Sequence, residues 1–91
     1  MAALFPLGRL VATPGTMELI RSAGEDLLPA LQEHHQSGDW GDVPPEDAHE
    51  NEFSVRHGLR VLSSYRVARD KLWVITESDR SATTLLLSSE Y

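Results

Sequence analysis

The hydrophobic pattern of this chain changes at Leu59. From there to residue 67, apolar and polar residues alternate with a period of two, which is typical of a β-strand with one buried face. Two further runs, residues 71–77 and 82–88, are rich in side chains that favour strands. Short polar turns separate the three runs. The C-terminal third therefore predicts a three-stranded antiparallel β-meander.

The preceding part of the chain favours helices, introduced by one short strand at residues 7–12. Thr13 is a typical N-cap and Gly24 a typical helix end, which predicts a first helix between them. Two more helices are expected over residues 27–36 and 46–57. We therefore predict an α+β fold, in which a short N-terminal strand and three helices precede the meander.

The 91 residues leave room for a single domain, spanning 1–91. Eight Lys and Arg against fourteen Asp and Glu give a net charge of −6, which argues against direct nucleic-acid binding because that requires cationic side chains. The absence of cysteine excludes disulfides and thiolate metal sites. No apolar stretch approaches the roughly 20 residues of a membrane span, and the N-terminus is a poor signal peptide. We expect a cytoplasmic protein that binds no membrane, metal or cofactor.

The excess negative charge is concentrated in residues 38–53, which contain no Lys or Arg. The acidic residues of this segment are Asp39, Asp42, Glu46, Asp47, Glu50 and Glu52. Acidic residues are favoured at a helix N-terminus for structural reasons alone. Alternatively, they form a patch that binds a basic partner. A divalent-metal site from Asp39, Asp42 and Glu46 is a third interpretation, although their spacing matches no calcium-binding loop.

Trp40 lies within this acidic segment, in a loop with glycine on both sides. A large aromatic side chain in such a loop either fills the edge of the core, here beside Trp73, or is an exposed anchor for a partner. Asn51 is either a buried hydrogen-bonding residue or a surface residue. The four histidines, at positions 34, 35, 49 and 57, are expected to be exposed or to cap helices, because their spacing does not suit a metal ion.

A second functional hypothesis concerns the predicted sheet, whose polar residues resemble the requirements of a metal-independent ribonuclease. In that chemistry, a His or Glu accepts the 2′-hydroxyl proton and Arg stabilises the phosphate. The candidate residues are His57, Arg66, Glu77, Arg80 and Thr83. The structural alternative is that the threonines pair across neighbouring strands and that the charged residues belong to turns. The net charge of −6 also weakens the ribonuclease hypothesis, because such an enzyme normally attracts a polyanion.

Several motifs, taken in order, resemble small bacterial plasmid-related proteins, some of them labelled as type I restriction-associated. The motifs comprise residues 12–15, 37–42, 51–52, 57–63 and 73–87, and the similarity extends over almost the whole chain. The resemblance implies a setting on plasmids or other mobile elements and carries over no catalytic residue. At the level of fold alone, the meander also resembles the sheet of small bacterial ribonuclease toxins.

Together these features predict a non-enzymatic accessory protein of mobile genetic elements that acts by protein–protein binding. An inhibitor of a host defence complex would fit, because nucleic-acid-binding partners present basic surfaces. The predicted contact residues are Asp39, Trp40, Asp42, Glu46, Asp47 and Glu50, with Trp40 as the anchor. The ribonuclease is the alternative, and a homodimer is left open.

Overall fold

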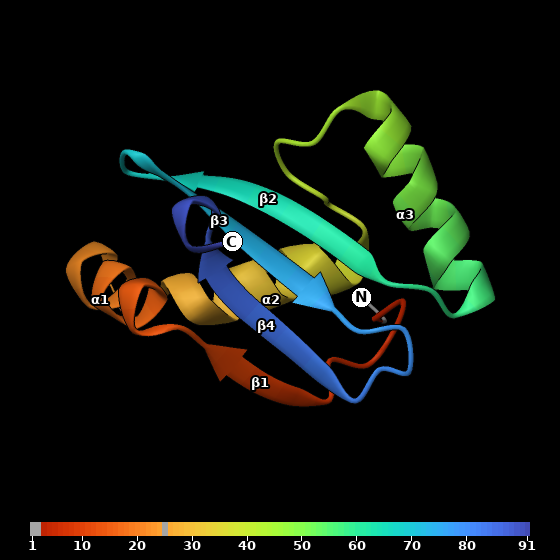
Figure 1. The fold of residues 1–91 in the computed structure, drawn as a ribbon, viewed down its shortest axis with the longest axis horizontal. Coiled ribbons are helices and arrows are strands. Elements are labelled where there is room, and N and C mark those ends of the chain that lie inside the picture. Colours follow the sequence, from red (N-terminus) through yellow and green to blue (C-terminus); the bar gives the residue numbers. More distant parts are fainter. Residues whose placement is uncertain (1–2, 25) are drawn as a thin grey trace.

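The computed structural model describes residues 3–24 and 26–91 and shows an α+β fold built on one mixed sheet (Figure 1). The strands lie in the order β1-β4-β3-β2, with one short 3₁₀ turn, η1, after the last of them. The elements are β1 (Arg9–Ala12), α1 (Pro14–Ala23), α2 (Leu27–Ser37), α3 (Pro45–His57), β2 (Val61–Val67), β3 (Asp70–Thr76), β4 (Ala82–Leu87) and η1 (Ser88–Glu90).

The predicted antiparallel meander is present as β2, β3 and β4, but the N-terminal strand joins it and makes a four-stranded sheet of mixed direction. The pairs β2–β3 and β3–β4 are antiparallel, but β1 adds to β4 in parallel, from Arg9 opposite Ala82 to Ala12 opposite Leu85. Three helices and two strands separate β1 from β4, and this connection is long enough for the chain to return in the same direction. The parallel pair covers the edge of β4 that a simple meander would leave open.

Local sequence signals explain where the helices begin and end. The Thr13 hydroxyl accepts a hydrogen bond from the Thr16 N–H at 3.2 Å and so caps α1, which ends at Gly24. Helix α3 ends at Gly58, whose left-handed backbone suits glycine. The predicted strands differ from the observed ones by one or two residues at most of their ends.

Two hydrophobic clusters form the core. The first joins Leu31 of α2 to Leu72, Val74 and Leu85 of the sheet, and α2 accordingly crosses one face of the sheet (Figure 1). The second lies beside edge strand β2, where α3 is placed, and consists of Phe5, Trp40 and Val61, with Leu7, Val43, Ala48 and Val55 packed around them. Among residues 3–24 and 26–91, no helix combines the length and apolar character needed to cross a bilayer.

Candidate acidic binding surface

The connection from α2 to α3 carries the first acidic residues and is fixed along the outer edge of β2. The Ser64 N–H donates to the Trp40 carbonyl at 3.0 Å, and the Asp42 N–H donates to the Ser64 carbonyl. Gly41 forms the bridge to Ser64 with a φ of 75°, and a Cβ there would collide with Ser64 and the Tyr65 ring. Glycine is therefore required at position 41, and the backbone of this connection is held by the sheet.

Trp40 is buried in the structure, with 5% of its surface exposed. Of the two interpretations from the sequence, the core residue is the one found, and the exposed anchor is wrong. Its ring stacks on Phe5 at 6.3 Å between centroids and meets the His35 ring edge-on at 6.1 Å. It does not lie beside Trp73, whose neighbour is the Tyr91 ring at 5.1 Å. An indole gains more from filling this core than from exposure to water.

The indole N–H of Trp40 donates to the Glu52 carboxylate at 3.1 Å. This bond satisfies the one polar group of the buried ring. It also places Glu52 over the second core cluster, so that one acidic residue of the segment has a structural partner. Trp40 therefore supports the acidic surface from beneath.

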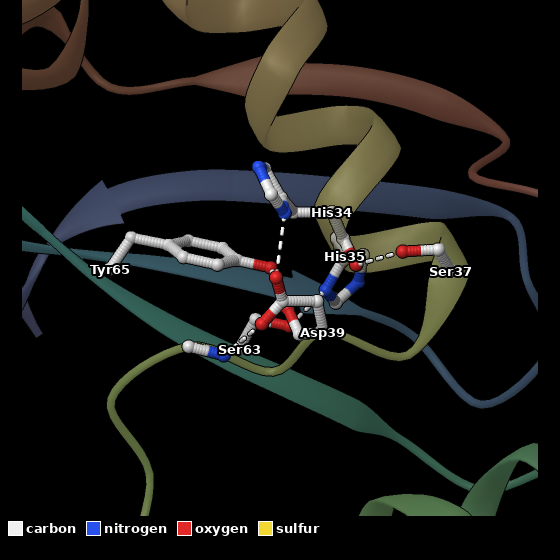
Figure 2. A network of polar contacts seen from close by, with 7 residues as sticks. His34, His35, Ser37, Asp39, Ser63 and Tyr65 are labelled. Atoms are coloured by element: carbon white, nitrogen blue, oxygen red, sulfur yellow. Dashed lines mark hydrogen bonds and ion pairs between the residues drawn. The ribbon is translucent and has the colours of Figure 1, made fainter.

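Asp39 belongs to a small polar network with His34 and Tyr65 (Figure 2). The His34 Nδ1 lies 2.7 Å from the Asp39 carboxylate, and the Tyr65 hydroxyl donates to the Asp39 carbonyl at 2.6 Å. Burial raises the pKa of Tyr65 to about 12, and the nearby Asp39 charge adds to this effect. The hydroxyl therefore stays protonated and acts as a hydrogen-bond donor that fixes the loop.

Asp42 has a cationic neighbour, the Lys71 ammonium of β3, at 3.4 Å. Both groups are largely exposed, so this ion pair contributes little to stability. The charge of Asp42 is thus partly compensated within the molecule, and the Asp39 carboxylate contacts the His34 ring.

Helix α3 carries four exposed acidic residues. Glu52 accepts the hydrogen bond from Trp40, and we call the other three, Glu46, Asp47 and Glu50, the α3 carboxylates. Within residues 3–24 and 26–91, none of the three forms an ion pair. Glu50 lies four residues after Glu46 and three after Asp47, so it neighbours both on the helix surface. Their charge is available to a partner.

Asn51 holds α3 against the sheet. Its side-chain amide donates to the Leu62 carbonyl at 2.7 Å and accepts from the Leu62 N–H at 3.1 Å. The two bonds occupy both backbone groups of an edge residue of β2, and Asn51 is itself buried. Of the two interpretations from the sequence, the buried hydrogen-bonding residue is the one found, and it fixes α3 to β2.

The described residues contain no group of three or more His, Asp or Glu arranged to hold a metal ion. The alternative of a divalent-metal site from Asp39, Asp42 and Glu46 therefore gains no support from the geometry. Asp39 and Asp42 instead make the separate contacts described above.

The alternative ribonuclease site is assembled only in part. Arg80 contacts the Glu77 carbonyl and Thr83 lies opposite Thr76, but Arg66 lies apart from them. Arg66 pairs with Lys71 at one end of the sheet, whereas Glu77 follows Thr76 at the other end. Six residue steps along the strand separate these positions, a distance of about 20 Å. Glu77 instead faces Arg60 at 3.7 Å.

His57 lies on α3, where its ring stacks on Phe53 at 4.0 Å. Thr83 is fully buried, and its hydroxyl donates to the Leu7 carbonyl at 2.8 Å. Because Thr83 is fully buried, its hydroxyl is closed to a substrate. The cross-strand threonine pair expected from the sequence is present, with 2.7 Å between the Thr76 and Thr83 hydroxyl oxygens.

The Arg80 side chain is used to hold the structure together. Its guanidinium donates to the carbonyl oxygens of Leu59 at 2.6 Å, Ser54 at 3.0 Å and Glu77 at 3.1 Å. Its carbon lies 5.3 Å from the centre of the Phe5 ring. These contacts join the end of α3, the β3–β4 turn and the N-terminal segment, and leave little of the guanidinium for a phosphate.

We expect Arg80→Ala to lower the free energy of unfolding by about 2–3 kcal/mol, because three carbonyls lose a charged donor. The matched variant is Arg66→Ala, whose side chain is exposed, and its effect should stay within about 0.5 kcal/mol. Urea denaturation followed by circular dichroism measures both. Equal effects of the two substitutions would contradict the structural role of Arg80.

His35 is the residue that the sequence interpretation missed. It was expected to be exposed or to cap a helix, but it is fully buried, with Nδ1 beside the Ser63 hydroxyl and Nε2 2.8 Å from the Thr76 hydroxyl. The signal was its position four residues after Leu31, on the side of α2 that faces the sheet. Ser63 is equally buried, so this Ser–His contact is closed to a substrate.

The hydroxyl chain beyond His35 sets its tautomer. Because Thr83 donates to the Leu7 carbonyl, Thr76 must donate to Thr83 and accept from His35 Nε2–H. The Nδ1 atom then accepts from Ser63. Burial, and secondly the positive charge of Arg80, lower the pKa of His35 to about 4, so the ring is neutral near pH 7.

No protein-family model, curated protein or solved structure matches this chain. Its function is therefore inferred from its own surface.

Proposed function

We propose that this protein binds another protein through a basic surface on that partner, with the α3 carboxylates at the centre of the contact. The observation that carries the proposal is that Glu46, Asp47 and Glu50 are exposed and form no ion pair within the described residues. They stand on a helix that Asn51 fixes to the sheet. A pre-organised group of like charges attracts and orients an oppositely charged partner.

Helix capping accounts for only part of this charge. Glu46 and Asp47 lie in the first turn of α3, where the helix dipole favours them. Glu50 lies one turn further on, where that effect has fallen off. Asp39 and Asp42 precede the helix altogether. The accumulation of acids extends beyond what the helix end requires, which favours a role in binding.

The setting that we propose is that of an accessory protein of mobile genetic elements in the cytoplasm. A host defence complex that binds nucleic acid presents a basic surface, and an acidic protein can occupy that surface in place of the phosphates. Inhibition of such a complex is the form of binding that suits both the charge and the resemblance to plasmid-related proteins.

A pair of charge-matched variants tests the proposal. The first, Glu46→Gln with Asp47→Asn and Glu50→Gln, neutralises the α3 carboxylates. The second, Glu18→Gln with Asp26→Asn and Glu33→Gln, neutralises three exposed acids of α1, α2 and the turn between them. Both change the net charge from −6 to about −3.

Each variant is immobilised and used to capture proteins from cells of the source organism, and the captured proteins are quantified by mass spectrometry. We expect the α3 variant to lose the partner and the matched variant to retain it. Equal capture by the unchanged protein and both variants, with unchanged melting temperatures, would contradict the proposal.

A further inference from the structure

The outer side of α3 carries exposed apolar surface next to its acidic residues. Phe53 is 55% exposed, and Leu59, just after the helix, is 46% exposed. Together with His49, Glu50 and Ser54 they line a shallow hollow of about 440 Å³. The stacking of Phe53 on His57 holds the ring in place at the rim. Exposed aromatic and aliphatic side chains around a hollow are typical of a contact surface for a partner.

The hollow is continuous with the acidic part of the helix. Glu50 and Ser54 also line a second, smaller hollow of about 200 Å³ between α3 and β2, which includes Asp47. Glu46, Glu50, Phe53 and His57 follow one another at spacings of four, three and four residues, along one side of the helix. The strip is about 16 Å long, with acids toward its N-terminal end and apolar side chains toward its C-terminal end.

The charge along this strip is not uniform. The C-terminal end of α3 carries Arg56, and Arg60 follows shortly after it, both exposed. A partner that is basic along its whole length would meet repulsion there. A partner whose cations are confined to one half, with apolar side chains in the other half, would match both ends of the strip.

We propose that this strip docks an amphipathic helix of the partner, with Lys or Arg against Glu46 and Glu50 and an apolar side chain seated between Phe53 and Leu59. This rests on the proposed function and deepens it, because it names the kind of segment that the acidic surface recognises. It also replaces Trp40, which is buried, with Phe53 as the exposed aromatic contact. Binding of a helix along an exposed groove is a common mode of peptide recognition.

The test uses two fluorescein-labelled 14-residue helical peptides. The first has three lysines in one half and two leucines in the other, at spacings of three or four residues, and the second has alanine in place of both leucines. We expect the leucine peptide to bind about tenfold more tightly, as measured by fluorescence anisotropy, because one apolar side chain is buried. Phe53→Ala should abolish this difference. The matched variant, Tyr91→Ala, removes another exposed aromatic ring away from α3 and should preserve it.

The result that would overturn the inference is equal affinity for the two peptides, or a tenfold difference that survives Phe53→Ala. Failure of both peptides to bind would also overturn it. None of these three results decides the proposed function, because the capture experiment with the charge variants tests that function separately. Unchanged melting temperatures of Phe53→Ala and Tyr91→Ala would show that both variants are folded, as expected for exposed side chains.

Discussion

Replacing Trp40 by alanine is expected to lower the free energy of unfolding by about 3–5 kcal/mol. The side chain is buried against Phe5 and Val61, and its removal leaves a cavity in the second core cluster. It also removes the indole donor that Glu52 accepts from. For a domain of this size, whose total stability is on the order of 5–10 kcal/mol, the variant would be at or near unfolding at 37 °C.

Thermal and urea denaturation of Trp40→Ala, followed by circular dichroism, measures this effect. Trp40→Phe is the matched variant, because it keeps an aromatic ring in the cluster and should recover about half of the loss. If Trp40 were an exposed contact residue, alanine at this position would leave the unfolding curve unchanged and would weaken only partner capture. That outcome would contradict the packing described here.

The second large effect is a loss of stability in acid caused by His35. Its pKa is about 4 in the folded protein and about 6.5 when unfolded, so between these values the unfolded chain binds more protons. The stabilising contribution is complete above pH 6.5 and is lost as the pH falls to about 4. The loss from this residue is about 3 kcal/mol. Protonation would place a charge among Ser63 and Thr76 with Arg80 nearby.

Urea denaturation at a series of pH values from 4 to 8 measures how the free energy of unfolding depends on pH. The glutamine of His35→Gln is uncharged throughout this range. Between pH 8 and pH 4, the free energy of unfolding of this variant should therefore fall by about 3 kcal/mol less than that of the unchanged protein. If the variant does not fold, NMR titration of the His35 ring replaces it, and the ring should remain neutral down to about pH 5. Protonation of the folded ring near pH 6.5 would contradict the burial of His35.

Local signals predicted much of the fold. The Thr13 cap, the glycine after α3 and the period-two alternation of β2 act within a few residues, and each appears in the structure close to its predicted place. The pairing of β1 with β4 could not be predicted in this way, because it joins segments about 70 residues apart and depends on which sheet edge remains open.

The candidate site, like the fold, could be predicted from the sequence only in part. The acidic segment was visible as a run of like charges, but the sequence did not show which acids lack a partner. That depends on Lys71 and His34, which the fold brings to Asp42 and Asp39. Similarly, the burial of Trp40 depends on Phe5, which lies 35 residues earlier in the chain.

The structural roles of His35 and Arg80 were not predicted from the sequence, and the reason is the same for both residues. Both are usually exposed, and they pack into a protein when other groups supply hydrogen bonds. Ser63 and Thr76 do this for the fully buried His35, and three backbone carbonyls do it for the half-buried Arg80. Such partners are not encoded in the residues next to either side chain.

The most direct measurement is the amount of partner captured by the α3 charge variant relative to the charge-matched variant of α1 and α2. The unpaired carboxylates of α3 predict a loss of tenfold or more for the first variant and retention of the partner by the second. Equal capture by both variants would show that Glu46, Asp47 and Glu50 are ordinary solvated residues, and would remove the basis for a binding surface on this helix.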